Sequence, residues 1–292
     1  MAFVAVSDLL RAADADGYAV GAFNLNNLEI LQAIIAAAEA EQAPVIIQAT
    51  QGGIKYGGLD YIAAMARVAA EEARVPVALN LDHGTSFEQA VRCIKAGFSA
   101  VMVDGSKLPF DENAALVKKV VDVAHAVGVS VEAELGKIGG TEDNITVSQR
   151  EALMTDPEEA AEFVARSGAD ALAVSIGTAH GVYQGEPKLD FARLQEIARA
   201  VSIPLVLHGA SGVPDGSIRE AVRLGIRKIN IDTEIRLAFA GSLRELLARD
   251  AGVYDPREIL GTAREAMQKV VQEKIRLFGA SGKARSAGGA GR

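Results

Sequence analysis

Three of the four histidines in this 292-residue chain are each followed by glycine, in the segments LDHG, TAHG and LHGASG. They are His83, His180 and His208. Catalytic zinc sites commonly use three protein ligands and leave a position open for water or substrate, and imidazole suits zinc well. One such histidine alone is more often a hydrogen-bonded core or loop residue, but three together favour a metal site. His125 falls inside a predicted helix and is interpreted as a structural or surface residue.

Carboxylates accompany these histidines. Asp82 directly precedes the first of them, so it can reach a second reactant without being a ligand. Asp104 follows the run VMV, Glu132 and Glu134 lie in VEAELG, and Glu142 lies in the glycine-containing segment GKIGGTEDN. Positioned carboxylates of this kind perform general acid–base catalysis. The alternatives are that Asp82 and Asp104 cap loops and that Glu142 is a solvated charge.

Two segments in the last third of the chain are suited to binding phosphate. HGASGV (208–213) offers open backbone, and NIDT (230–233) leads directly into a predicted helix. Barrel enzymes frequently bind phosphate with the loops after strands seven and eight, through backbone N–H groups and a helix N-terminus. GASG alone is a weak signal, but its place beside His208 strengthens the prediction.

Lysine chemistry is the main competitor for breaking a carbon–carbon bond, because a lysine at a strand end can form a Schiff base. The candidates are poorly placed: Lys107 and Lys137 lie in predicted loops, and Lys228 opens its strand at the wrong end. A hydrolase site of the HxH type is not indicated either, since the first strand ends in Phe23 and Asn24.

Eight apolar runs rich in Val and Ile predict the strands that must position these groups. They span residues 18–23, 45–49, 77–81, 100–103, 129–133, 171–174, 203–207 and 226–231. Segments with helical spacing lie between them, over residues 28–41, 59–73, 87–96, 113–127, 157–166 and 191–200. Ser86 with Gln89 and Asp156 before Pro157 are start signals for two of these helices.

Continuous apolar strands alternating with helices indicate a parallel sheet covered on both faces. Eight such units predict an α/β fold, a (β/α)8 TIM barrel, in which the polar strand ends meet at one rim. An open doubly wound sheet is the alternative, but the first strand is followed by GAFNLNN rather than a G-x-G-x-x-G fingerprint. We expect a single catalytic domain over 1–280 with extra C-terminal helices, including 259–278, and a flexible Gly- and Ala-rich tail over 281–292. The long gap 136–155 is expected to be a mobile active-site loop.

The composition narrows the function classes. A net charge of −8 without a basic stripe argues against nucleic acid as a partner. Neither a membrane span nor a signal peptide is evident, so we expect no membrane association and a cytoplasmic protein. Cys93 is the single cysteine and is expected to be a buried, inert thiol, which excludes a disulfide framework and a thiolate-rich zinc site.

The motifs LDHG, AELG followed by GG and ED, TAHG, HGASG and NIDT together resemble the class II fructose-bisphosphate and tagatose-bisphosphate aldolase family. The match runs from about residue 7 to 283 and includes YDPRE and FGASGKA, which look closer to the fructose-bisphosphate members. The resemblance implies a metal-dependent aldehyde-lyase of glycolysis and gluconeogenesis. It would cleave fructose 1,6-bisphosphate reversibly to dihydroxyacetone phosphate and glyceraldehyde 3-phosphate through a zinc-stabilised enediolate. Such an ion polarises the ketone as a Lewis acid, in place of a lysine iminium.

The resemblance also implies a role for each matching residue. His83, His180 and His208 would bind zinc, or cobalt in its place, while Asp104 and Glu134 would hold the ion in a second, more buried location. Asp82 would be the acid or base at the aldehyde carbonyl, and Glu142 would exchange the proton on dihydroxyacetone phosphate. The substrate contacts would be Thr50, Gly181, Gly209, Ala210, Ser211, Asn230, Ile231, Asp232, Thr233 and Arg257.

Further partners follow from the same resemblance. A monovalent cation would lie near the phosphate site, and Arg257 would reach the site of a neighbouring subunit in a homodimer or homotetramer. Arg257 also fits an exposed ion pair at a helix start. The chain also fits a tagatose-bisphosphate aldolase, a metal-dependent hydrolase on the same scaffold, or a phosphosugar-binding barrel without catalysis.

Overall fold

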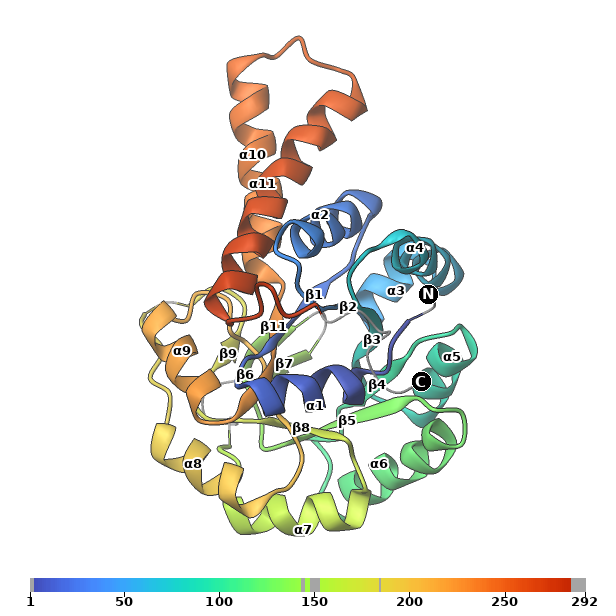
Figure 1. The fold of residues 1–292 in the computed structure, drawn as a ribbon, viewed down its shortest axis with the longest axis vertical. Helices are drawn as coiled ribbons and strands as arrows, with labels where there is room; N and C mark the ends of the chain where they lie inside the picture. Colours follow the sequence, from blue (N-terminus) through green and yellow to red (C-terminus); the bar gives the residue numbers. More distant parts are fainter. Residues whose placement is uncertain (1–2, 143–144, 148–152, 184, 285–292) are drawn as a thin grey trace.

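Eight parallel strands close into a barrel in the order β1-β2-β3-β4-β5-β8-β10-β11 (Figure 1). The structure is a computed structural model that describes residues 3–142, 145–147, 153–183 and 185–284, with backbone alone at 141, 142 and 145–147. The barrel strands are β1 (Val20–Asn24), β2 (Val45–Thr50), β3 (Val77–Gly84), β4 (Ala100–Val103), β5 (Ser130–Leu135), β8 (Ala171–Val174), β10 (Leu205–Leu207) and β11 (Ile226–Ile231). The prediction of a (β/α)8 barrel is therefore confirmed.

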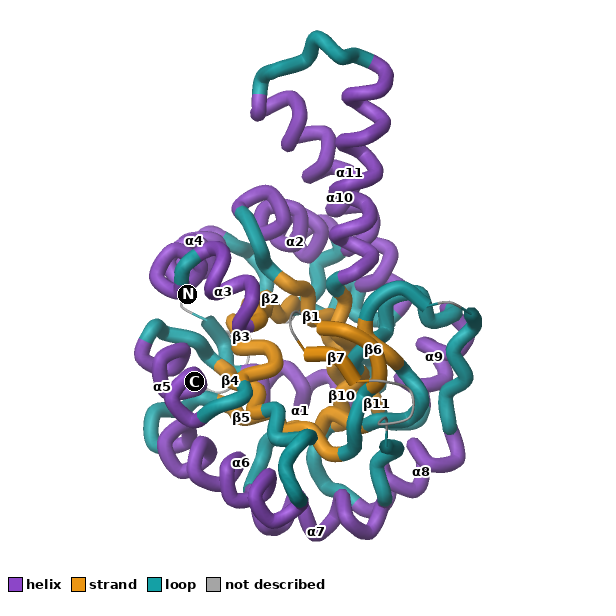
Figure 2. Tube along the Cα trace, turned by 180° about the vertical axis from the view of Figure 1, so that it is seen from behind, coloured by secondary structure: helices purple, strands orange, loops and turns teal. Residues whose placement is uncertain are grey.

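Helices surround the barrel and follow the strands along the chain (Figure 2). They are α1 (Val6–Asp16), α2 (Leu28–Ala40), α3 (Gln51–Gly57), α4 (Leu59–Glu72), α5 (Phe87–Lys95), α6 (Phe110–His125), α7 (Pro157–Ser167), α8 (Phe191–Ala200), α9 (Asp215–Arg223), α10 (Thr233–Arg249) and α11 (Pro256–Leu277). The two predicted start signals are used: Ser86 Oγ accepts from Gln89 N at 3.2 Å, and Asp156 caps α7 ahead of Pro157. Among the described helices, none combines the length and apolar character that crossing a bilayer requires.

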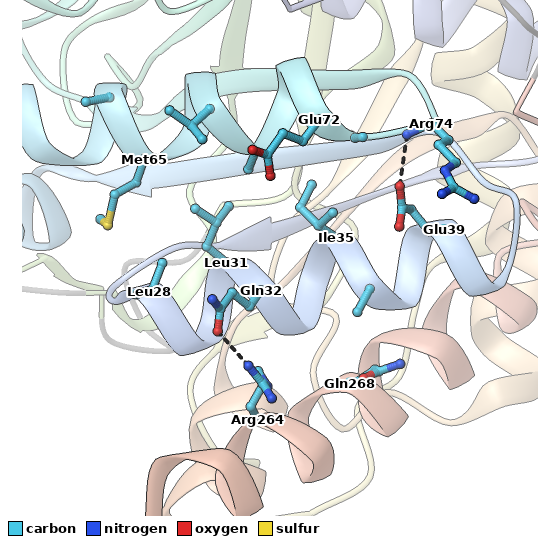
Figure 3. Close-up of a pocket in the computed structure, with 15 residues that line it drawn as sticks. Leu28, Leu31, Gln32, Ile35, Glu39, Met65, Glu72, Arg74, Arg264 and Gln268 are labelled. Atoms are coloured by element: carbon cyan, nitrogen blue, oxygen red, sulfur yellow. Dashed lines mark hydrogen bonds between the residues drawn. The ribbon is translucent and has the colours of Figure 1, made fainter. Parts of the chain in front are cut away.

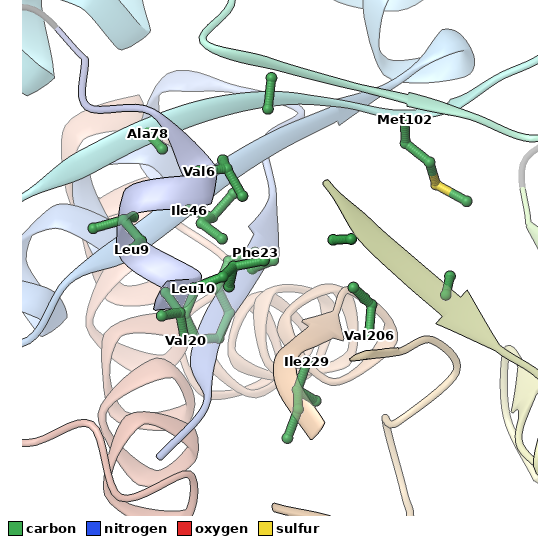
Figure 4. Packing of buried hydrophobic residues seen from close by; sticks show 14 of the residues in the cluster. Val6, Leu9, Leu10, Val20, Phe23, Ile46, Ala78, Met102, Val206 and Ile229 are labelled. Carbon is green, nitrogen blue, oxygen red and sulfur yellow. The ribbon is translucent and has the colours of Figure 1, made fainter. Parts of the chain in front are cut away.

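The core forms on both faces of the sheet because the strands are buried nearly throughout. Side chains inside the barrel pack in layers, and those outside pack against the helices. At the N-terminal end of the barrel, Val6, Leu9 and Leu10 of α1 are buried in the core cluster (Figure 4). This end is thus closed by apolar packing, which leaves the opposite rim for chemistry.

Cys93 and His125 lie where the sequence predicts. Cys93 is fully buried in α5, and burial raises the pKa of its thiol to about 12. His125 lies at the end of α6 with its Nε2 2.9 Å from Asp170, and its side chain is 44% exposed. Neither residue is near the three other histidines, so the rim chemistry does not involve them.

The segment after β5 contains a short antiparallel pair, β6 (Gly139–Glu142) and β7 (Ile145–Val147), that the sequence did not suggest. β6 also pairs in parallel with β9 (Ala179–His180), with Gly140 opposite His180. Residues 143–144 and 148–152 of the predicted mobile loop lie outside the described residues. The pairing brings the backbone of this loop beside a candidate metal ligand.

The C-terminal helices α10 and α11 pack against each other and project from the barrel as an arm (Figures 1 and 2). Lys274 of α11 and Glu234 of α10 form an ion pair of 2.6 Å near its base. After α11 the chain returns to the barrel, where Gly282 and Ala284 donate backbone hydrogen bonds to Glu41 and Gln42. The first residues of the predicted tail therefore lie against the barrel, and residues 285–292 lie outside the described residues.

Candidate active site

Asp82 and His83 are consecutive residues of β3, yet both line the same hollow at the barrel rim. In regular strands neighbouring side chains point to opposite faces. Here Leu81 pairs with Val101 and Gly84 with Val103, so β3 contains one extra residue, and His83 adopts a left-handed φ of 49°. A bulge of this kind re-aims a side chain. Gly84 permits it, because a Cβ at this position would lie 2.7 Å from Met102 O.

The three rim histidines converge on one point. His83 Nε2 lies 3.0 Å from His208 Nδ1, and ring centroids of His83 and His180 are 5.0 Å apart. One ligand nitrogen from each of the three lies within 4.8 Å of the others. Two nitrogens on one zinc ion at 2.0–2.1 Å are about 3.3 Å apart in a tetrahedral site, so these rings fit a zinc ion with little movement. A hollow of about 20 Å³, lined by His83 and His180 but not by His208, adjoins this point.

Carboxylates lie on the other side of the His83 ring. His83 Nδ1 is 2.9 Å from Asp104 Oδ2 and 3.9 Å from Glu134 Oε2, which makes a second group of candidate ligands. Burial opposes a charge on His83, but Asp82, Asp104 and Glu134 outweigh it and raise the pKa of His83 well above its usual value. Burial and the charge of Asp104 raise the pKa of Glu134. The clustered carboxylates thus favour a positive charge beside them.

The other two histidines favour the neutral form that binds metals. Burial, together with the neighbouring His83 and His208, lowers the pKa of His180 well below its usual value. Burial also lowers the pKa of His208, although its hydrogen bond with Glu132 acts in the opposite direction. His208 is fully buried. These two rings are therefore available as ligands without first losing a proton.

The predicted phosphate residues line the same hollow. It is formed by Asn24, Asp82, His83, His180, Gly181, Gly209, Ala210, Ser211, Asn230, Asp232 and Thr233. The first residue of α10 is Thr233, so the N-terminus of this 17-residue helix borders the hollow. Gly209 has a φ of 62°, and a Cβ there would lie 2.5 Å from Ala179 O. The close approach of these two loops brings the glycine backbone beside the histidines, as anion binding requires.

Comparison with known proteins identifies this arrangement. The model of the family described as "Fructose-bisphosphate aldolase class-II" matches residues 4–283. The chain belongs to this family. It is 47% identical to the fructose-bisphosphate aldolase of Thermus caldophilus, over 95% of this chain and 98% of that protein. It is 48% identical to that of Geobacillus stearothermophilus, over 97% of this chain and 99% of that protein.

Solved structures agree with the family assignment. The YdjI aldolase of Escherichia coli K12 superposes with a TM-score of 0.86 at 36% identity, covering 97% of this chain and 100% of that one. A fructose-1,6-bisphosphate aldolase described as putative, from Coccidioides immitis, gives a TM-score of 0.86 at 32% identity, covering 95% and 96%. The resemblance seen in the sequence is thus confirmed. The chain is a metal-dependent aldehyde-lyase of the class II aldolase family.

Two residues that the sequence analysis missed hold Asp82 in place. Asn24 Nδ2 donates to Asp82 Oδ2 at 2.9 Å, and Gln48 Nε2 donates to the same oxygen at 3.2 Å and to Asn24 Oδ1 at 2.8 Å. Asn230 Nδ2 donates to the other oxygen, Asp82 Oδ1, at 3.1 Å. The signal for Gln48 was available, because an amide in the otherwise apolar run VIIQA must find a buried partner.

Tyr183 is a third missed residue, and it joins two loops of the aldolase site. Its hydroxyl accepts from Ala179 N at 2.7 Å and donates to Gly209 O at 2.8 Å. Burial raises the pKa of this phenol, which favours the donating, protonated form. The loop carrying His180 and the loop carrying His208 are thereby fixed to each other.

Four predicted site residues remain: Thr50, Ile231, Glu142 and Arg257. Thr50 is buried next to Asp82 in the strand register, but its hydroxyl accepts from Gly53 N and caps α3. Ile231 is buried in β11 and is not among the residues that line the hollow. The backbone of Glu142 ends β6, and its side chain lies outside the described residues. Arg257 lies on the projecting arm with its side chain 90% exposed.

Proposed function

We propose that this chain reversibly cleaves fructose 1,6-bisphosphate to dihydroxyacetone phosphate and glyceraldehyde 3-phosphate, using a zinc ion held by His83, His180 and His208. The observation that carries the proposal is the convergence of these three histidines beside Asp82 and beside the N-terminus of α10. Relatives that are 47% and 48% identical over nearly the whole chain are named fructose-bisphosphate aldolases, which supports this substrate.

The donor set fits a borderline ion such as zinc or cobalt, because it combines imidazole nitrogens with carboxylates and has no thiolate. A bound divalent ion supplies Lewis-acid stabilisation of the negative charge that develops on the ketone oxygen during cleavage. We propose that Asp104 and Glu134, on the far side of His83, form the second location for the ion. The distances of 2.9 and 3.9 Å to His83 Nδ1 support this role.

The proton transfers are assigned to two carboxylates. Asp82, held by Asn24, Gln48 and Asn230, takes the proton from the sugar hydroxyl while the central carbon–carbon bond breaks. Glyceraldehyde 3-phosphate then leaves with a new carbonyl, and the electron pair of the broken bond remains on the dihydroxyacetone phosphate carbon. Glu142 returns a proton to that carbon. The pairing of Gly140 with His180 brings the loop of Glu142 beside the histidines and supports this assignment.

The phosphate of dihydroxyacetone phosphate is assigned to Gly181, Gly209, Ala210, Ser211 and residues 230–233. Backbone N–H groups and the positive end of the α10 dipole favour an anion there. We also propose a monovalent cation near this phosphate, as the resemblance to the family implies. Thr50 would contact the triose through its position beside Asp82, while its hydroxyl stays on Gly53 N.

We propose that the chain forms a homodimer, alone or as half of a homotetramer, through the surface around the arm. Leu237 and Tyr254 of the arm are 54% and 90% exposed. A groove of about 810 Å³ lies beside the arm, between α2, α4 and α11, with Leu28 and Ile35 on its apolar wall (Figure 3). Exposed apolar side chains on the arm beside this partly apolar groove support an interface here. Arg257, at the start of α11, would then reach the second phosphate of substrate bound in the neighbouring subunit.

A coupled assay for triose phosphate release tests the proposal on fructose and tagatose 1,6-bisphosphates, with and without chelator. We expect cleavage of the fructose sugar, abolished by chelator and restored by zinc or cobalt. Preference for the tagatose sugar would reassign the substrate. Release of inorganic phosphate without triose phosphates would indicate a hydrolase, and binding without turnover would indicate a catalytically silent barrel.

A further inference from the structure

Lys228 is a fully buried lysine inside the barrel that the assigned chemistry does not use. It lies in β11 two residues before Asn230, so its side chain occupies the layer beneath the site. Its neighbour Arg227 points outward and pairs with Asp14 of α1 at 2.7 Å. A buried ammonium is strongly unfavourable unless it is paired. Lys228 Nζ is paired with Glu132 Oε2 of β5 at 2.8 Å, as an ion pair rather than an aligned hydrogen bond.

The other oxygen of Glu132 contacts a predicted metal ligand. Glu132 Oε1 lies 2.9 Å from His208 Nε2, and the opposite ring nitrogen, Nδ1, faces His83. An ammonium is a donor only, so Lys228 leaves Glu132 as an acceptor, and the hydrogen of His208 must sit on Nε2. Asn230 Nδ2 also approaches His208 Nε2 at 3.2 Å, but its better acceptor is Asp82 Oδ1 at 3.1 Å. The lone pair of His208 Nδ1 is thus directed at the three-histidine centre.

We propose that Lys228 and Glu132 form a positioning pair that fixes the orientation and tautomer of His208 and thereby sets the affinity of the site for its divalent ion. Carboxylates that accept from a ligand histidine act in this way in many metal sites. In this chain a lysine holds the carboxylate from below, and neither residue touches the substrate hollow. The inference rests on the proposed three-histidine ion site.

Fold stability alone does not explain the pair. Replacing a buried ion pair by apolar side chains of similar volume is often neutral or stabilising, whereas removing one partner leaves an unpaired charge. A second use of Lys228, as a Schiff-base nucleophile, conflicts with its zero exposure and with the contact to Glu132. A role in orienting His208 explains why Glu132 contacts His208 and why Lys228 is paired with Glu132.

The test measures the dissociation constant of Co²⁺ by chelator competition on the metal-free full-length protein, together with the visible spectrum of bound Co²⁺. Lys228→Met should weaken Co²⁺ binding by about 10- to 100-fold. Arg227→Met removes a cation from the next residue of the same strand and should leave the affinity unchanged. If Lys228 acts through Glu132, adding Glu132→Gln to Lys228→Met should weaken binding by less than the sum of the two separate effects.

The variant Lys228→Met/Glu132→Leu keeps the test decisive if the single variant folds poorly, because it removes both charges together. We expect its metal-free melting temperature to stay close to that of the unchanged protein, with the rise on adding Co²⁺ clearly reduced. Unchanged Co²⁺ affinity and spectrum in either variant, or fully additive losses, would overturn the inference. Failure of the unchanged protein to bind Co²⁺ would instead overturn the three-histidine site itself, so the two ideas fail separately.

Discussion

Arg257 offers the sharpest test of how the site is completed. Its guanidinium is 90% exposed on the projecting arm and pairs with Asp255 at 2.7 Å, so in its own chain it has no role at the rim. In a dimer it would bind the second phosphate of a bisphosphate bound by its partner through paired, charge-assisted hydrogen bonds. Losing such contacts corresponds to about 10- to 100-fold in kcat/KM. The exposed ion pair with Asp255 contributes little free energy, so Arg257 loses little when it leaves Asp255 to bind a phosphate.

Arg257→Ala should therefore raise KM for fructose 1,6-bisphosphate and slow cleavage by that factor. Proton exchange on dihydroxyacetone phosphate should stay nearly intact, because this half of the substrate has a single phosphate, assigned to the glycine loops. Asp255→Ala is the matched control: it removes the local partner of the guanidinium and should leave cleavage close to normal. Equal damage to both reactions, or to neither, would remove Arg257 from the site.

Mixing two impaired variants decides whether Arg257 acts across a subunit boundary. Asp82→Ala and Arg257→Ala proteins are unfolded together and refolded, so that subunits recombine. Half of the dimers are then mixed, and one of their two sites has both intact residues if Arg257 comes from the partner, which restores about one quarter of full activity in a symmetric dimer. No restored activity in a mixture shown to contain mixed dimers would refute action in trans.

Three further outcomes follow from the site. Chelator should abolish turnover, zinc or cobalt should restore it, and borohydride with substrate should not trap the protein; chelator-resistant turnover with trapping would instead indicate a lysine nucleophile. Asp82→Ala should lose cleavage by about 10²- to 10⁴-fold while keeping its metal, and Glu142→Ala should lose proton exchange on dihydroxyacetone phosphate by a similar factor, so losses under about tenfold would argue against these roles. Tyr183→Phe should raise KM and lower the free energy of unfolding by about 1 to 2 kcal/mol, because it breaks two part-buried hydrogen bonds. Tyr56→Phe, on an 82% exposed tyrosine, is its control, and equal effects in both would deny Tyr183 its bridging role.

The barrel and the convergence of three histidines at its rim were predictable because both follow from simple patterns. Continuous apolar runs alternating with helical segments leave few folds other than a parallel barrel. Polar residues at the ends of such runs must then share one rim, which is why His83 and His208 appeared as partners although 125 residues separate them. The loops proposed to bind phosphate follow from the same logic, since glycine next to a helix start is suited to anions.

The local geometry was not predictable from pattern alone. Regular alternation would have turned either Asp82 or His83 away from the rim, and the extra residue before Gly84 that prevents this has no simple sequence signature. The pairing of Gly140 with His180 joins segments 40 residues apart through backbone hydrogen bonds, which side-chain patterns do not encode.

Lys228 shows that a residue too deep to act at the rim can still contribute to the site from below. A lysine near the start of its strand is too deep to act at the rim, and this correctly argued against Schiff-base chemistry. A residue near the start of a barrel strand can nevertheless face the barrel interior, in the layer below the rim. A buried ionisable side chain there needs a partner of opposite charge. Gln48 and Asn80 present the same signal: both are buried amides in apolar strands, and in the described part of the chain the two polar atoms of the Asn80 side chain have no hydrogen-bond partner. Such residues lower the stability of the fold. A polar side chain inside an apolar barrel strand is therefore evidence for chemistry at the rim above it. Applied to the sequence, this reasoning would have selected Gln48, Glu132 and Lys228 together, ahead of any structure.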